Sequence, residues 1–255
     1  MATKLASIST TERLRRGKSA IPELLELHGM DVARWRDDFM GDLFVGGSAP
    51  GAYQSTASGA AAAAAAISAG LANGAILLDS GTDNAGRSDL SLGRHFSGNR
   101  NAHAWWYAKV SSVATEKFEL GFTDVISGTD AGAVNNKAGN TFNADDAVVL
   151  CLDTDNNTLL SLMGVKATAA ATKVNFNTVL AADTFYYFGI ELRDTWARGY
   201  LLDANGKLLE MTAWMADAVT AATLLTPWAF QQNRAASAHT MTIDLLDCYQ
   251  RRTTA

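Results

Sequence analysis

The fold is decided by residues 185–209, FYYFGIELRDTWARGYLLDANGKLL. The first nine residues alternate with a period of two, which is typical of a half-buried β-strand. One face would carry Tyr186, Phe188, Ile190 and Leu192, and the other Phe185, Tyr187, Gly189, Glu191 and Arg193. After a second apolar run, residues 200–202, the motif Asn205-Gly206 predicts a hairpin, because a type I′ turn needs positive φ at both central residues. We therefore expect two successive hairpins in an antiparallel meander.

Outside this stretch, most of the chain shows the same pattern of short apolar runs separated by Gly, Asn, Asp and Ser. Residues 105–113 alternate well, and we expect residues 117–124 to form their antiparallel neighbour. Residues 147–153 and 158–164 predict another hairpin. A long closing strand is expected at residues 240–249, with Met241, Ile243 and Leu245 on one face.

About a dozen short strands with little helix predict an all-β protein. We expect a two-sheet antiparallel jelly-roll sandwich with an N-terminal extended arm and a short helix. The segment 211–225 is alanine-rich, with Met211, Trp214 and Met215 at helical spacing, and is expected to be a short helix or a loop crossing.

Seven consecutive alanines, Ala60 to Ala66, carry two opposed signals. Alanine is the best helix former, whereas Gly59 and Gly70 flank the run and no polar stripe defines an exposed helix face. We interpret the run as a tightly packed strand, whose small side chains let another layer or subunit approach closely.

The N-terminal residues differ from the body in charge, with +4 in residues 1–20 and −9 in residues 21–255. Ser19, Pro22 and a later glycine predict a short helix, which is too short to be stable unless its leucine face packs on something. We divide the chain into a basic arm with this helix, residues 1–35, and a jelly-roll domain, residues 36–255. The arm is either a docking element or a solvated terminus, and its candidate partner-binding residues are Lys4, Arg13, Arg15, Arg16, Lys18, Leu24, Leu25 and Leu27.

Composition argues against several classes of protein. Cys151 and Cys248 are too far apart to suggest a disulfide framework or a metal motif, and we expect two buried free thiols. The net charge of −5 does not favour nucleic-acid binding. No stretch approaches the roughly 20 apolar residues that a spanning helix needs, so we expect no membrane partner. Residues 153–164 fail the calcium-loop pattern at Thr158 and Gly164, and we expect no metal or other cofactor.

The acidic residues do not suggest catalysis. Glycoside hydrolysis uses two carboxylates that flank one bond. Strand alternation places Glu191 and Asp194 on opposite faces, and likewise Glu116 and Glu119. We therefore do not expect an enzyme. Trp105 and Tyr107 share one strand face and are candidates for a glycan-stacking platform.

Several segments resemble the strand pattern of concanavalin A-like (laminin G-like) jelly rolls, namely residues 106–110 (WYAKV), 119–124 (ELGFTD), 187–203 and 242–246 (TIDLL). The chain is also similar to structural proteins of tailed bacteriophages. That likeness covers residues 36–252 and adds no catalytic residues. It rests on three segments: the opening RDDFMGD (36–42), the central GFTD (121–124), and the ending from TID (242–244) through QRR (250–252).

The resemblance implies a non-enzymatic virion component. The first expectation is a capsid decoration or cement protein on the capsid exterior, which binds the major capsid protein or another virion protein and its own copies, with a trimer favoured. The alternative is a tail-associated carbohydrate-binding module for host recognition. The resemblance makes residues 185–209 scaffold that nucleates the central meander, and the binding work would fall to the arm and the long loops. The long polar loop at residues 127–146 either carries function or is simply mobile.

Overall fold

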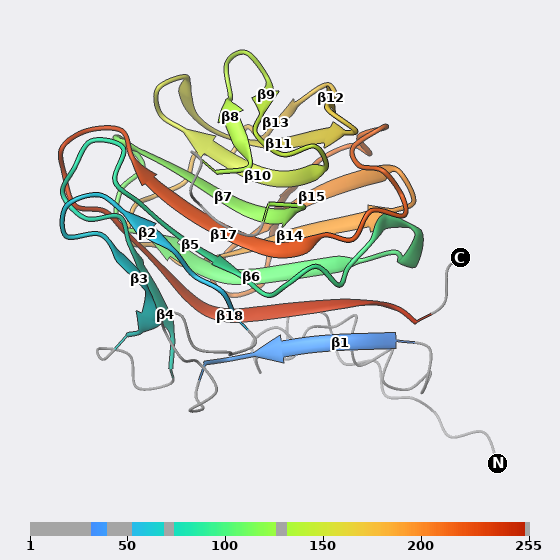
Figure 1. The fold of residues 1–255 in the computed structure, drawn as a ribbon, viewed down its shortest axis with the longest axis horizontal. Coiled ribbons are helices and arrows are strands. Elements are labelled where there is room, and N and C mark those ends of the chain that lie inside the picture. The colour runs from blue at the N-terminus through green and yellow to red at the C-terminus, as the bar shows by residue number, and fades with distance from the viewer. Residues whose placement is uncertain (1–31, 40–52, 69–73, 126–131, 253–255) are drawn as a thin grey trace.

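The computed structural model describes residues 32–39, 53–68, 74–125 and 132–252, which form two antiparallel sheets packed face to face (Figure 1). Sheet A contains, in spatial order, β16 (Leu208–Met211), β15 (Trp196–Leu202), β14 (Tyr186–Arg193), β6 (His103–Val110), β18 (Thr240–Arg251), β4 (Ile76–Asp79) and β3 (Ala63–Ile67), and β1 (Val32–Asp37) also pairs with β18. Sheet B contains β12 (Ala169–Ala170), β11 (Asn157–Lys166), β10 (Ala147–Asp153), β7 (Glu116–Thr123), β17 (Thr226–Asn233), β5 (Arg87–Ser91) and β2 (Ala57–Ser58), and β13 (Val174–Asn175) pairs with β11. The predicted two-sheet antiparallel sandwich is confirmed.

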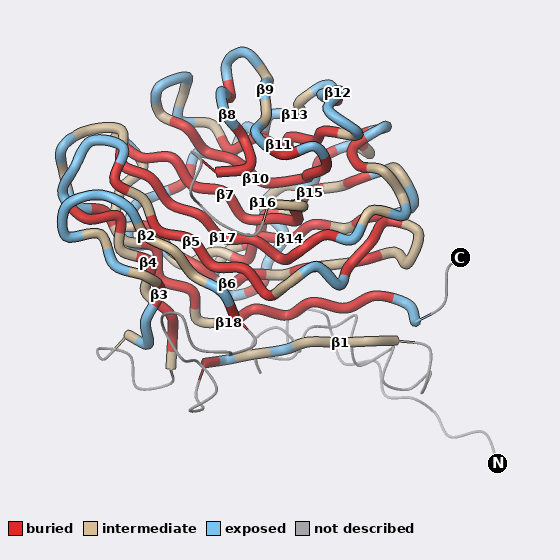
Figure 2. The backbone as a smooth tube through the Cα atoms, viewed as in Figure 1, coloured by how far each residue is buried: buried red, intermediate tan, exposed pale blue. Residues whose placement is uncertain are grey.

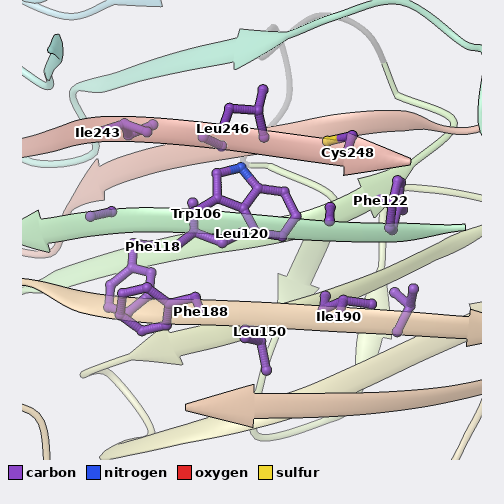
Figure 3. Packing of buried hydrophobic residues seen from close by; sticks show 14 of the residues in the cluster. Trp106, Phe118, Leu120, Phe122, Leu150, Phe188, Ile190, Ile243, Leu246 and Cys248 are labelled. Atoms are coloured by element: carbon purple, nitrogen blue, oxygen red, sulfur yellow. The ribbon is translucent and has the colours of Figure 1, made fainter. Parts of the chain in front are cut away.

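The main core lies between the two sheets, where the inward-facing residues of both interdigitate (Figure 3). Trp106 of sheet A meets Phe122 of sheet B at 6.4 Å between ring centroids, and Phe188 meets Phe118 at 5.8 Å. Most residues of the central strands in both sheets are buried, and exposed residues lie mainly at the turns (Figure 2). Cys151 and Cys248 are buried free thiols, as predicted.

The predicted meander is present as β14, β15 and β16. The type I′ prediction for its second turn is wrong, because only Gly206 has positive φ, at 76°. The Asp203 carboxylate instead accepts hydrogen bonds from the backbone N–H groups of Asn205 and Lys207, each at 2.9 Å. This local bonding stabilises a longer turn, and the register shifts between Leu201 and Leu202 to accommodate it.

The predicted pairing of residues 117–124 with residues 105–113 is also wrong. β6 pairs with β14 and β18 in sheet A, whereas β7 pairs with β10 and β17 in sheet B. Two consecutive amphipathic strands show the same alternation whether they pair edge to edge or face each other across the core. Here they face each other, because the connection crosses from one sheet to the other.

β18 departs from simple alternation. Met241 and Ile243 lie in the main core as predicted, but the register shifts between Ile243 and Leu245. Leu245 therefore lies on the outer face of sheet A, and Leu246 returns to the core. The prediction that Leu245 shares a face with Met241 is corrected by this β-bulge.

The alanine run is not helical in the structure. Ala63 to Ala66 form most of β3, an edge strand of sheet A, and Ala60 and Ala61 lie in the turn before it. Tertiary context overrides propensity here, because pairing with β4 joins the run to sheet A, whereas an isolated helix of this length is only marginally stable in water. Residues 211–225 form no helix either, and the described part of the chain contains only the short 3₁₀ helix η1 (Gly98–Arg100). No helix among these residues is long and apolar enough to span a membrane.

The structure describes only parts of two further predicted segments, the arm and the long polar loop. Residues 1–31, which include the predicted short helix and all eight candidate arm residues, lie outside the described part of the chain. β1 pairs with β18 from Val32 onward, so sheet A includes four residues that the sequence assigned to the arm. The expected long loop at residues 127–146 contains the hairpin of β8 (Val134–Asn136) and β9 (Thr141–Phe142) in its described portion.

Candidate functional site

The outer face of sheet B is covered by its own chain. Trp228, Phe230 and Val149 project from this face and pack against Ala133 and Val134, which belong to the segment around β8. These residues are fully buried. The central part of this face is therefore a second core layer and offers no open surface.

A buried ion pair lies under the same segment. Lys117 Nζ is 2.9 Å from Glu119 Oε1, and both side chains are completely buried. The Glu119 carboxylate also accepts hydrogen bonds from the backbone N–H groups of Ala133 and Val134 at 2.8 and 3.0 Å, and from Trp228 Nε1 at 3.0 Å. Because internal donors occupy this carboxylate, it holds the segment in place and is not presented to a ligand.

The outer face of sheet A is different, because aromatic side chains of four neighbouring strands meet on it. Strand register places Trp105, Gly189 and Tyr200 opposite one another on β6, β14 and β15. A second row brings Tyr107 opposite Tyr187. We call this surface the aromatic face, and it comprises His103, Trp105, Tyr107, Tyr187, Gly189, Tyr200 and Tyr249.

Trp105 is the centre of the aromatic face. An ideal Cβ atom at Gly189 would stand 2.5 to 2.7 Å from three atoms of the Trp105 six-membered ring, so the ring occupies the space above Gly189. Tyr200 approaches from the other side with its ring centroid 5.4 Å from that of Trp105. Both rings are partly exposed. The absence of a side chain at Gly189 is what allows Trp105 to lie against the sheet.

The other rings of the aromatic face are stacked. Tyr107 lies between Tyr187 and Phe185, with centroid distances of 4.4 and 4.7 Å and interplanar angles of 25°. Both faces of the Tyr107 ring are therefore occupied, and a ligand can reach only its edge and hydroxyl. His103 stacks on its cross-strand neighbour Tyr249 at 4.5 Å and 11°. Such pairs contribute about 0.5–1.5 kcal/mol each beyond area burial, so they rigidify the surface.

Charged groups border the rings. Tyr200 donates its hydroxyl hydrogen to Glu191 Oε2 at 2.5 Å, and Arg193 lies 3.3 Å from Glu191 Oε1. The guanidinium groups of Arg193 and Arg198 lie 4.9 and 4.2 Å from the ring centroid of Trp214, at cation–π distance. The surface thus combines apolar rings with fixed hydrogen-bonding groups, which is the composition of many ligand sites.

The titratable rings of the aromatic face are neutral at physiological pH, and burial moves their pKa values further from it. Burial lowers the pKa of His103 to about 4, and it raises the pKa of Tyr187 to about 12. Burial, together with the hydrogen bond to Glu191, raises the pKa of Tyr200 to about 12. Tyr200 therefore remains a hydrogen-bond donor, and His103 carries no charge near pH 7.

A small cavity of about 170 Å³ lies at one end of the aromatic face, where β1, β6, β14 and β18 meet. We call it the end cavity, and its walls include Val32, His103, Glu191, Arg193, Tyr249 and Arg251. The side chain of Tyr249 is almost fully buried, and its hydroxyl has no hydrogen-bond partner in the described part of the protein.

A larger cavity of about 460 Å³ lies beside β1, between Trp35, Leu92 and Phe96. Two of the polar side chains on its walls, those of Arg34 and Gln250, are already engaged. Arg34 forms a bidentate pair with Asp247 at 2.9 Å for both contacts, and Gln250 bonds the backbone of Ser97 and His95. This cavity offers mainly apolar walls, and the end cavity offers the more distinctive polar groups.

The structure places both predicted platform residues, Trp105 and Tyr107, on one face of sheet A. Their surroundings differ, because among the described residues stacking partners occupy both ring faces of Tyr107 but leave one ring face of Trp105 free. Glu191 lies beside them, whereas Asp194 lies in the turn after β14 with φ of 55°. Sequence alternation already placed Tyr187, Gly189 and Glu191 on one strand face. It did not identify Tyr200, Trp214 and Tyr249 as their neighbours, because strand order is not visible in a single sequence.

No protein-family model and no curated protein matches this sequence. Solved structures match it over most of its length. A protein of unknown function from Shewanella oneidensis MR-1 has a TM-score of 0.59 at 17% identity, over 99% of both chains. Peanut lectin has a TM-score of 0.56 at 10% identity, over 88% of this chain and 100% of the lectin. The fold is a lectin-like jelly roll.

A further match is the exoplasmic/lumenal domain of VIP36 in a Ca²⁺-bound form, with a TM-score of 0.57 at 10% identity over 87% of this chain and 91% of that domain. The described residues of the present chain contain no group of three or more His, Cys, Asp or Glu side chains suited to hold a metal ion. In the oxygen-rich turn after β4, the carboxylates of Asp79 and Asp83 accept hydrogen bonds from backbone N–H groups of Gly81 and Ala60. The calcium ion of the VIP36 structure is therefore not transferred to this chain.

Proposed function

We propose that this chain is a non-catalytic carbohydrate-binding domain whose binding surface is the aromatic face of sheet A. The observation that carries the proposal is the placement of Trp105, which lies on Gly189 with its ring partly exposed and with Glu191 and Tyr200 beside it. A pyranose presents C–H groups on its ring faces and hydroxyl groups around its rim. The C–H groups pack on the electron-rich face of an indole ring, and the hydroxyl groups bond neighbouring polar side chains.

The lectin-like neighbours support this proposal at the level of the fold. One matching structure is of VIP36 with Ca²⁺ and Man2, with a TM-score of 0.55. At about 10% identity no sugar contact is carried over to this chain. The binding surface proposed here rests on this chain's own side chains.

A hydrolytic function is less well supported. The described walls of the end cavity contain one carboxylate, that of Glu191, and Arg193 and Tyr200 already bond both of its oxygens. Hydrolysis of a glycosidic bond requires a second carboxylate within about 5–10 Å to act as nucleophile or base. The surface therefore fits binding without turnover.

A glycan array on the purified chain tests this function, with Trp105→Ala and Leu224→Ala as a matched pair of variants. Leu224 is a 47% exposed apolar residue outside the aromatic face, so its loss controls for a general change in surface hydrophobicity. We expect the wild type and Leu224→Ala to bind the same glycans and Trp105→Ala to lose at least tenfold in affinity. Absence of any glycan signal, or an unchanged Trp105→Ala profile, would reject the proposal.

A second candidate function is that of a structural component of a tailed-phage particle, and one feature of the sheet edge favours it. In β16 the apolar residues Leu208, Leu209 and Met211 are 40–50% exposed on an edge strand. An exposed apolar edge is suited to burial against another copy of the chain or another virion protein. On this proposal the protein lies on the capsid exterior and its basic residues 1–30 contact the shell.

Deletion of residues 1–30 tests the second candidate cleanly, because every described strand begins after this segment. The truncated protein should retain the β-sheet circular dichroism and thermal transition of the full chain. It should no longer sediment with phage capsids that bind the full chain. Equal sedimentation of both proteins would reject the role of the arm.

A further inference from the structure

The end cavity continues the aromatic face by one row of side chains. On β18, Asp247 is the register partner of Trp105. His103, Glu191 and Tyr249 lie two residues from Trp105, Gly189 and Asp247, respectively, on the same face of β6, β14 and β18. A ligand that lies along Trp105 therefore reaches the cavity without leaving the surface. We propose that the end cavity binds the carboxylate group of an acidic sugar residue, an inference that rests on the carbohydrate-binding function proposed above.

Two guanidinium groups supply positive charge at the cavity. Arg193 is held between Glu191, at 3.3 Å, and the ring of Trp214, at 4.9 Å, so its position is set before a ligand arrives. Arg251 ends β18 and is exposed at the cavity rim. A guanidinium group binds a carboxylate through two parallel hydrogen bonds, which gives both charge and orientation.

Glu191 cancels only one of these two positive charges. Among the residues that the structure describes, it is the only carboxylate on the cavity wall, and its two oxygens already bond Tyr200 and Arg193. His103 adds no charge near pH 7, because burial lowers its pKa to about 4. One positive charge therefore remains in excess among the cavity residues, which favours an anionic group over a neutral one.

Tyr249 adds the second, independent observation. Tyr249 lines the cavity, and only 3% of the residue is exposed. Its hydroxyl is buried and has no hydrogen-bond partner among the described residues. A buried hydroxyl without a hydrogen bond is unfavourable, so a ligand that accepts this bond gains affinity. Burial also raises the pKa of Tyr249 far above its usual value, so the group is a donor. A carboxylate oxygen is the matching acceptor.

An inorganic phosphate or another small anion shares part of this chemistry. The neighbouring aromatic face distinguishes the sources, because it offers a stacking surface that only a sugar ring uses. The cavity volume of about 170 Å³ also leaves room for only a small group. The position therefore suits the carboxylate of one sugar residue whose ring, or whose neighbour, rests near Trp105.

The inference is tested by calorimetric titration with tetragalacturonate and with its methyl ester, which keeps the rings and removes the charge. We expect the acid form to bind at least tenfold more tightly than the ester. Arg251→Gln should remove most of that difference and leave the ester's affinity unchanged, and Tyr249→Phe should weaken the acid form at least threefold. Lys207→Gln is the matched control, since it removes one exposed positive charge from the turn between β15 and β16 and should change neither affinity.

The outcomes separate this inference from the proposed function. If both ligands bind equally and depend on Trp105, the carboxylate site is overturned and carbohydrate binding stands. If neither binds, this oligosaccharide is not a ligand of the rings and the glycan array decides whether carbohydrate binding stands. The cavity is then probed with galacturonate monomer and with inorganic phosphate by NMR of a ring-labelled Tyr249. A Tyr249 shift with galacturonate alone supports the site. No shift, or equal shifts with both anions, overturns it.

Discussion

The six-membered ring of Trp105 lies directly over Gly189 on the neighbouring strand, where a Cβ atom would stand 2.5 Å from Cζ3. Trp105 and Tyr200 flank Gly189 in the strand register and meet above it. The position of the indole ring thus depends on a residue that contributes no side chain. Substitution of Gly189 therefore tests the role of the aromatic face without changing any of its rings.

Gly189→Ala should displace the Trp105 ring without unfolding the domain. The new methyl group meets the movable end of a side chain and not backbone, so we expect a small loss of stability, a changed tryptophan fluorescence maximum and at least a fivefold loss of glycan affinity. Gly139→Ala is the control, because its nearest neighbours lie at 3.8 Å. Wild-type fluorescence and affinity in Gly189→Ala would contradict this account.

Glu119→Gln should strongly destabilise the protein. The substitution removes the negative charge 2.9 Å from the buried Lys117 ammonium group, and breaking a buried pair in this way costs about 3–5 kcal/mol. The free energy of unfolding from urea titration measures the effect, and amide hydrogen exchange at Ala133 and Val134 should quicken because their acceptor is weakened.

The double variant Lys117→Met/Glu119→Gln serves as the control for the same site. It removes both charges, so it should be markedly more stable than Glu119→Gln alone. If the single and double variants unfold at the same urea concentration, the ion pair is not what stabilises the segment around β8.

Glu116 should make the protein less stable as the pH rises. Burial raises its pKa from 4.5 to about 9, and neither carboxyl oxygen has a partner in the described part of the chain. The unfolded chain loses this proton near pH 4.5, whereas the folded chain keeps it until about pH 9. The contribution of Glu116 to the free energy of unfolding is therefore most favourable below pH 4.5, and it falls as the pH rises to about 9. The penalty at pH 7 is about 3 kcal/mol.

Glu116→Gln removes that titration and keeps the shape of the side chain. We expect the variant to have a higher free energy of unfolding than the wild type, and we expect this difference to be larger at pH 8 than at pH 5. Urea unfolding at both pH values measures it. Parallel pH profiles for the two proteins would show that the Glu116 carboxyl does not remain protonated in the folded state.

Leu208→Glu should reduce self-association if β16 is an interface. Leu208 is 50% exposed on this edge strand, and a charge at an edge opposes pairing with another chain. Sedimentation velocity over a range of concentrations measures the effect, with Leu224→Glu as a control at similar exposure. A wild type that stays monomeric at high concentration, or equal behaviour of both variants, would exclude β16 as a self-association surface.

Much of the fold follows from local pattern. Period-two alternation placed Phe188 and Ile190 in the core, and the same pattern placed Tyr187, Gly189 and Glu191 together on the opposite face. The Asn205-Gly206 signal located a turn correctly but misidentified its type, because the Asp203 carboxylate binds the turn backbone. A side-chain cap of this kind competes with the intrinsic preference of a dipeptide.

The sequence by itself determined the fold class, the alternation of each strand and the residues that form the meander, since these depend on near neighbours in the chain. Only the tertiary structure decided which strands share a sheet, and hence that β7 faces β6 and does not pair with it. It also decided that Trp105, Tyr200 and Tyr249 meet on one surface. Strand order depends on contacts between residues far apart in the chain, and alternation is identical for every order that buries the same face.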